Sequence, residues 1–375
     1  MVNEERLVKN FLLLAGINGP SREEKDVAQV IEAELCDLGF TVQRDNAGES
    51  IGGNTGNIIA FKRGTAPNGL PITFNAHMDT VSPTTGLDAK IEDGVIRSDG
   101  NTILGADDRA GISAILEGLR IVQEEQLPHG DIQVIFTISE ETGLFGAKHL
   151  DPKLIASNCV YVFDVGKPVA GITVSAPFQD NITAVFHGKA SHAGAEPENG
   201  INAILAASRA ISMMKLGRVD EETTANVGVI TGGKATNIVP EYCKIKCEAR
   251  SRDGAKLAAQ TQSMVEAIHE GAADVGAEVM IDIARSYDGY RLQREDSTVA
   301  LAVEAARRTG IEPELGAGGG GSDANVFNAA GIPAVPIGIG YEHPHSTDEL
   351  LPVADFVKCA EMAVSLVKVA SDART

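Results

Sequence analysis

Short apolar segments that alternate with helical segments constrain the fold of this chain more than any other feature. Four of these segments lie in the first half of the chain, at 57–63, 70–77, 131–139 and 159–166. Short and nearly continuous apolar strands separated by helices are typical of a parallel sheet that is covered on both faces. The sequence therefore predicts an α/β fold with a mixed, mostly parallel sheet sandwiched by helices.

Apolar residues at helical spacing predict amphipathic helices around these strands. They lie at 3–16, 21–39, about 110–125 and 144–150. The second helix is predicted to begin at Ser21, because Glu24 three residues later completes a capping-box pattern, and to end near Gly39.

The pattern of the sequence changes near residue 178. Residues 181–190 alternate apolar and polar side chains, as in a half-exposed strand. The elements predicted next are a helix at about 200–216, strands at 225–232 and 242–251, a helix at 254–275 and a strand at 277–285. The order βαββαβ predicts a ferredoxin-like α+β domain inserted into the chain.

After about residue 288 the first pattern returns. Helices are predicted near 296–309, 323–330 and 352–371, and a strand at 332–340. We therefore expect one discontinuous domain, formed by 1–177 and 288–375, and one inserted domain at 178–287.

Composition excludes some classes of partner. The 375 residues carry a formal net charge of −20, which argues against nucleic acid and anionic membrane surfaces but not against metal cations. The five scattered cysteines suggest free thiols in a reducing compartment. Because the first 16 residues have a helical pattern and no apolar run approaches the length of a membrane span, we expect a soluble cytoplasmic protein.

Side chains that can hold a metal follow the predicted strands. Ligands of open α/β sheets bind beyond the carboxyl ends of the strands. The residues found there, or in the loops that follow, are His77, Asp79, Asp107, Glu140, Glu141, Asp164 and His345. Imidazole and carboxylate ligands without cysteine suit zinc and its neighbours, and several carboxylates suit a dinuclear site.

Five short motifs carry a resemblance to a known family. They are HMDT at 77–80, GADDRAG at 105–111, SEETG at 139–143, FDVG at 163–166 and HSTDE at 345–349. In this order they resemble the co-catalytic dinuclear zinc peptidases, in the superfamily of the aminoacylases, carboxypeptidase G and peptidase T. The peptidase T-like members are the most similar branch, and the resemblance spans nearly the whole chain.

The resemblance implies two Zn²⁺ per subunit, with Co²⁺ or Mn²⁺ as possible alternatives. It assigns His77 and Asp164 to the first metal, Glu141 and His345 to the second, and Asp107 as the bridge between them. Asp79 would orient His77, and Glu140 would be the general base. The Asp107–Asp108 peptide is expected to be cis.

The resemblance also implies roles for the two domains. The discontinuous domain would be the catalytic metallopeptidase domain, and the inserted domain would serve as a lid and form a homodimer. His192 would stabilise the oxyanion, while Asn237 and Arg250 would hold the substrate backbone and its terminal carboxylate.

Some of these residues have plausible alternatives. His343 competes with His345, which is favoured because it directly precedes the Ser-x-Asp-Glu stretch. Arg252 shares a strand face with Arg250, and either arginine could be a surface charge. Asn237 could simply cap a turn. Cys243 and Cys247 could suggest a metal pair, but a shared face with an apolar residue favours packing.

The resemblance predicts an aminopeptidase that releases the N-terminal residue of short peptides. Aspartate at position 164 favours this activity, because glutamate is usual there in the carboxypeptidases and deacylases of the family. A carboxypeptidase or an N-acyl amino acid deacylase remains the alternative. A catalytically silent homologue is disfavoured, because every expected ligand and Glu140 are present.

Overall fold

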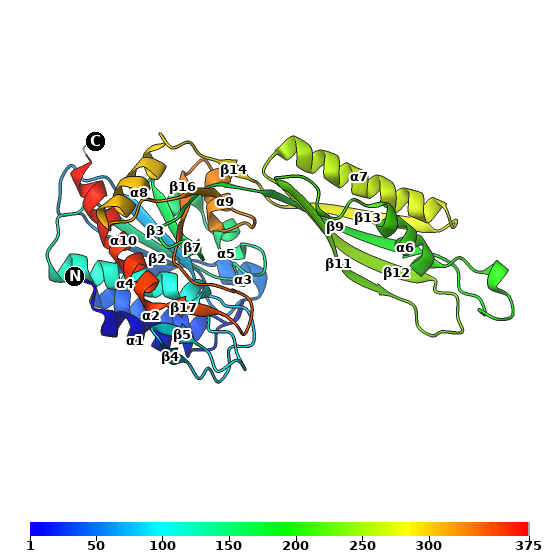
Figure 1. The fold of residues 1–375 in the computed structure, drawn as a ribbon, viewed down its shortest axis with the longest axis horizontal. Helices are drawn as coiled ribbons and strands as arrows, with labels where there is room; N and C mark the ends of the chain where they lie inside the picture. Colours follow the sequence, from blue (N-terminus) through cyan, green and yellow to red (C-terminus); the bar gives the residue numbers. More distant parts are fainter. Residues whose placement is uncertain (374–375) are drawn as a thin grey trace. The chain divides into compact units, whose positions relative to one another are not determined.

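The computed structural model describes residues 1–373, and the chain divides into two compact units (Figure 1). The first unit contains Met1–Val174, Leu292–Gly318 and the residues from Ser322 onward. The second unit contains Ser175–Arg291 and Gly319–Gly321. Gly319–Gly321 thus belong to the second unit, although their position after residue 288 predicts the discontinuous domain. In the structure a Cβ atom on Gly321 would lie 2.4 Å from the ring of Tyr287.

The large sheet has a parallel centre and antiparallel flanks. Its strand order is β1 (Thr41–Arg44), β2 (Ile58–Lys62), β6 (Ile132–Thr137), β3 (Ile72–His77), β7 (Val160–Val165), β16 (Ala334–Gly338), β8 (Ile172–Ala176) and β14 (Tyr290–Arg291), and β15 (Leu315–Ala317) also pairs with β8. The pairs β6–β3, β3–β7 and β7–β16 are parallel. The predicted mostly parallel sheet is therefore confirmed, whereas β1, β8, β14 and β15 were not foreseen.

The parallel strands are buried along almost their whole length because both faces of the sheet are covered, and the buried residues include polar side chains such as Thr73 and Asn75. Every residue of β3 and of β6 is buried. Helix α4 (Ala106–Glu124) packs on β3 and β7, and α1 (Glu4–Ala15) and α10 (Val353–Asp372) pack on α4 (Figure 1). Helix α9 (Asp323–Ala329) contacts β7 and β16.

The remaining elements of this unit are smaller. Helices α3 (Ala47–Ile51) and α5 (Phe145–His149) contact one another, and α8 (Ser297–Arg308) packs on α10. The short strands β17 (Leu350–Pro352), β5 (Val95–Arg97) and β4 (Lys90–Glu92) form a separate sheet that was not predicted.

Helix α2 begins later than its sequence pattern suggested. It spans Lys25–Asp37, and Glu24 at its N-cap makes no side-chain hydrogen bond to the helix. Ser21 Oγ instead donates to Asp79 Oδ2 at 2.6 Å. The predicted capping box is therefore wrong, because both of its side chains have partners far away in the sequence.

The second unit has its own antiparallel sheet and core. The strand order is β10 (Gly217–Arg218), β11 (Thr223–Gly232), β12 (Tyr242–Ser251), β9 (Phe178–His187) and β13 (Glu278–Tyr287). Helices α6 (Ala203–Met213) and α7 (Gly254–Ala273) pack on it. Apart from the two-residue strand β10, which was not predicted, the element order agrees with the predicted βαββαβ pattern. Cys243 and Cys247 are buried in this core beside Ile245, so packing explains them.

Among residues 1–373, no helix is both long enough and apolar enough to span a membrane.

Candidate metal centre

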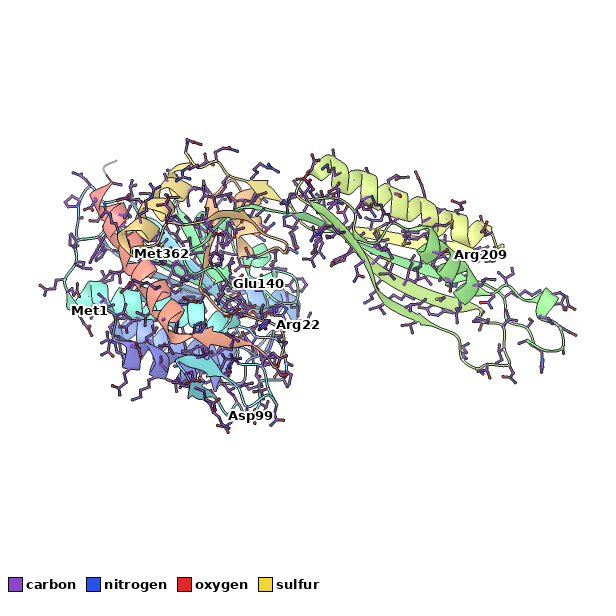
Figure 2. The ribbon with its side chains drawn as sticks, in the orientation of Figure 1. Met1, Arg22, Asp99, Glu140, Arg209 and Met362 are labelled. Atoms are coloured by element: carbon purple, nitrogen blue, oxygen red, sulfur yellow. The ribbon has the colours of Figure 1, made fainter. Side chains whose placement is uncertain are left out.

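The candidate ligands of the first unit converge because their strands are parallel. His77 is the last residue of β3, and it pairs with Thr137 at the end of β6. On the other side of β3, Asn75 pairs with Val162 of β7. His77 and Asp164 therefore each lie two residues beyond this pair, His77 on β3 and Asp164 on β7. Glu140 and Glu141 follow β6 at the same edge, and Figure 2 labels Glu140 in this unit.

Asp107 and His345 reach this edge from loops. Asp107 lies at the start of α4 with φ −80° and ψ 101°, which is not helical, and the Asp107–Asp108 peptide is cis, as the resemblance implied. His345 follows β16 and has φ +61°. The competing residue, His343, is exposed, as His345 is, but only His345 belongs to a group of candidate ligands.

The ligand atoms form two triads that share Asp107. In the first, His77 Nε2 lies 3.1 Å from Asp107 Oδ1 and 3.7 Å from Asp164 Oδ1. In the second, His345 Nε2 lies 3.3 Å from Asp107 Oδ2 and 3.0 Å from Glu141 Oε2. Each triad has its ligand atoms within 4.8 Å of one another. Asp107 thus offers one oxygen to each histidine.

The electrostatics of this cluster suit divalent cations. Burial, followed by the charge of Asp164, raises the pKa of Glu140 well above its usual range. Hydrogen bonds to Asp107 and Glu141 raise the pKa of His345 to about 10, because these carboxylates strongly attract positive charge. Glu141 Oε1 is buried and accepts no hydrogen bond among the described residues. Two nitrogen donors, several buried carboxylates and an acceptor oxygen without a hydrogen bond from the described residues fit a pair of divalent metal ions.

A second set of carboxylates holds the backbone of the ligands. Asp108 Oδ2 accepts the N–H of His77 at 3.0 Å. Glu349 accepts the N–H of Asp107 at 2.9 Å and that of Gly105 at 2.7 Å. Both carboxylates are buried. Because buried N–H groups need acceptors, these bonds hold the backbone of two candidate ligands, His77 and Asp107.

Asp79 lies between His77 and the two glutamates. His77 Nδ1 is 2.9 Å from the carbonyl oxygen of Asp79 and 3.4 Å from its carboxylate, so the carbonyl is the nearer acceptor. The carboxylate of Asp79 accepts the N–H groups of Glu140 at 2.9 Å and Glu141 at 3.2 Å. Asp79 therefore touches both halves of the cluster.

Three residues around this cluster were not predicted from the sequence. Asp108 and Glu349 stand inside the motifs at 105–111 and 345–349, and their place in those motifs was the available signal. Glu24 was assigned to a capping box, although its carboxylate accepts hydrogen bonds from Ser139.

The other predicted residues lie in the second unit. His192 Nδ1 accepts the N–H groups of Gly194 at 3.1 Å and Ala195 at 3.0 Å, which leaves Nε2 to carry the proton. Arg250 pairs with Glu248 through Nε at 3.1 Å and Nη2 at 3.0 Å. Asn237 is exposed, and its carbonyl accepts the N–H of Ala193.

The family model described as peptidase family M20/M25/M40 matches residues 73–369. The chain belongs to this family. The predicted resemblance to its peptidase T-like members is confirmed by relatives that match almost end to end, and the chain is a peptide hydrolase of the family.

Three relatives illustrate the similarity. An uncharacterized protein of Bacillus subtilis, YqjE, is 43% identical and covers 99% of this chain and 100% of its own length. The crystal structure of the aminopeptidase PepT from Bacillus cereus is 40% identical, covers 98% of this chain and 99% of its own, and has a TM-score of 0.90. A tripeptidase from Staphylococcus aureus is 36% identical, covers 100% of both chains and has a TM-score of 0.94.

Proposed function

We propose that this chain is a dinuclear zinc-dependent aminopeptidase that releases the N-terminal residue of short peptides. The observation that carries the proposal is the position of Asp107, whose two oxygens face two histidines that each have a further carboxylate. The similarity to an aminopeptidase and to a tripeptidase supports the choice of substrate.

In this proposal the ligands are those assigned from the sequence. His77, Asp107 and Asp164 would hold one ion, and Asp107, Glu141 and His345 would hold the other. Bound there, the ions would supply Lewis-acid activation of a peptide carbonyl and of water. Zinc is proposed from the donor set, and Co²⁺ or Mn²⁺ would suit the same nitrogen and oxygen ligands.

Glu140 moves the proton. It is buried, with 8% of its surface exposed, and its N–H donates a hydrogen bond to Asp79. A buried carboxylate beside the proposed ions can take a proton from water and then give it to the leaving amine. Its neighbour Glu141 faces His345 instead, so the two adjacent glutamates have separate tasks.

The second unit would supply substrate contacts. The proton on Nε2 of His192 can be donated to a developing oxyanion. Arg250 would bind the terminal carboxylate and Asn237 the peptide backbone. We further propose that the first unit is the catalytic domain, and that the second serves as a lid and joins two copies of the chain as a homodimer.

The deciding experiment identifies products by mass spectrometry. The substrates are di- and tripeptides, their N-acetylated forms and their C-terminal amides. Zinc-loaded and chelator-treated protein are compared, with metal added back to the treated sample. Release of the N-terminal residue that disappears on chelation and returns with zinc is the expected result.

Two other outcomes would contradict the proposal. Release of the C-terminal residue or of the acetyl group would retain the metal-dependent hydrolysis but replace the substrate class. Release of nothing from any peptide would refute the aminopeptidase assignment.

A further inference from the structure

Glu24 lies far along the sequence from the motifs, yet it accepts hydrogen bonds from the turn that contains Glu140 and Glu141. This carboxylate is 0% exposed, although it stands at the N-cap of α2. It makes no hydrogen bond to that helix. Helix capping therefore does not explain why a charged group is buried here, and its hydrogen-bond partners must lie elsewhere.

One oxygen of Glu24 accepts three hydrogen bonds. Glu24 Oε1 lies 2.9 Å from the N–H of Ser139, 3.0 Å from Ser139 Oγ and 2.9 Å from the N–H of Arg22. The N–H of Arg22 is also 3.0 Å from Ser139 Oγ. Figure 2 labels Arg22 and Glu140 in the first unit. Glu24 thus joins the segment before α2 to the turn after β6.

Both residues that donate to Glu24 have a left-handed backbone. Ser139 has φ +50° and Arg22 has φ +77°, although neither is glycine. Such a conformation is disfavoured for residues with a Cβ atom and persists where surrounding contacts hold it. The shared oxygen of Glu24 is such a contact for both, and the φ of Ser139 sets the direction in which the chain enters Glu140.

Asp79 holds the two residues of the turn that follow Ser139. Glu24 accepts the N–H of Ser139, and Asp79 accepts the N–H groups of Glu140 and Glu141. Three successive N–H groups of the turn therefore end on two buried carboxylates. Arg109, which is also 0% exposed, contributes a positive charge close to both.

We propose that Glu24 is a positioning residue, whose oxygen Oε1 holds Ser139 so that Glu140 and Glu141 point to the reacting atoms. The proposal rests on the function proposed above, in which Glu140 moves the proton. In this role Glu24 Oε1 accepts hydrogen bonds from Ser139 and Arg22 at a defined position. Its negative charge is not itself required for that role.

Two substitutions separate acceptance from charge. Glu24→Gln keeps an oxygen at the same reach but removes the charge. Glu24→Asp keeps the charge but withdraws the oxygen by one methylene group. The matched control is Glu117→Asp, because Glu117 is another buried carboxylate of the first unit and accepts the N–H of Asn3 at 3.0 Å, away from the cluster.

For the proposal to hold, Glu24→Asp must lower kcat by roughly 10- to 100-fold with little change in KM, because small misplacements at a reacting centre have effects of this size. Glu24→Gln must retain most of kcat, and so must Glu117→Asp. If Glu24→Asp is the more active of the two Glu24 variants, charge is what matters and the proposal is overturned.

Hydrogen exchange gives a readout that does not need activity. The amides of residues 139–141 should exchange faster in Glu24→Asp than in the wild type, and close to the wild-type rate in Glu24→Gln. Equal exchange in both Glu24 variants would overturn the proposal. If the wild type hydrolyses no peptide, the proposed function fails, while the exchange comparison still decides the role of Glu24.

Discussion

At the scale of the residue, Asp107 can serve two histidines because its backbone departs from the helix that it begins. Its φ and ψ are −80° and 101°, and its N–H is held by Glu349 at 2.9 Å. The carboxylate is therefore directed out of the helix, with Oδ1 towards His77 and Oδ2 towards His345. A helical conformation at this position would turn the side chain in a different direction, tilted towards the N-terminus of α4.

Glu140→Gln should abolish turnover while leaving both metals bound. The amide cannot take a proton from water, so kcat should fall by roughly a hundred- to ten-thousand-fold. Steady-state kinetics and metal analysis of the purified variant check this. Glu141→Gln is the matched control on the next residue, and it should reduce the metal content. Unchanged turnover in Glu140→Gln would show that another group moves the proton.

Arg250→Ala should weaken the binding of peptides that have a free carboxylate. A charge-assisted hydrogen bond contributes about 1.5–3 kcal/mol, so KM for a tripeptide should rise roughly 10- to 100-fold. KM for the C-terminal amide of the same peptide should change much less. Arg252→Ala is the control, because Arg252 is a nearby arginine that lies just beyond the end of β12. Equal effects on acid and amide would contradict the assignment of Arg250 to the carboxylate.

At the scale of the element, α4 approaches β7 closely enough to exclude a methyl group. A Cβ atom on Gly111 would lie 2.3 Å from the carbonyl oxygen of Phe163 and 2.3 Å from Asp108 Oδ1. Phe163 precedes Asp164, and Asp108 holds the N–H of His77. The contact between helix and strand thus positions two of the candidate ligands.

Gly111→Ala should destabilise the protein even though alanine favours helices. Forcing the methyl group between helix and strand should lower the free energy of unfolding by about 1–3 kcal/mol. Denaturant unfolding of the first unit measures this. Gly316→Ala is the control, since nothing lies within 4 Å of its added Cβ atom. A Gly111→Ala protein as stable as the control would refute the close approach.

At the scale of the whole molecule, the chain has two separate cores. One core collects the apolar residues of the first unit, and the other lies between the five-stranded sheet and helices α6 and α7 of the second unit. All five proposed ligands lie in the first unit. Binding of a metal should therefore stabilise one unit and not the other.

Removal of metal should lower the melting temperature of the first unit alone. A ligand present at a hundred times its Kd stabilises the folded state by about 2.7 kcal/mol, and chelation removes this contribution. Calorimetry with and without chelator should show one transition that moves and one that does not. Segment-resolved hydrogen exchange would assign each transition to its unit. Equal shifts of both transitions would contradict the assignment of every ligand to the first unit.

The sequence by itself determined most of the helices and strands, and the edge of the large sheet at which the candidate ligands lie. The buried strand β6 is rich in apolar residues, and the half-exposed β9 alternates in its burial, so the apolar pattern was sufficient to find both strands. Parallel strands bring their carboxyl ends to one edge, and that is why His77, Asp164 and Glu141 could be grouped before any distance was known.

Only the tertiary structure decided which side chains hold that edge in place. Ser21 and Glu24 fit a local capping pattern, yet their partners are Asp79 and Ser139, 58 and 115 residues away. In the same way, the acceptor oxygens of Glu349 reach N–H groups more than 240 residues earlier. A buried N–H group must have an acceptor, and the tertiary fold determines which acceptor lies within reach. The spacing of residues along the chain therefore does not predict these hydrogen bonds.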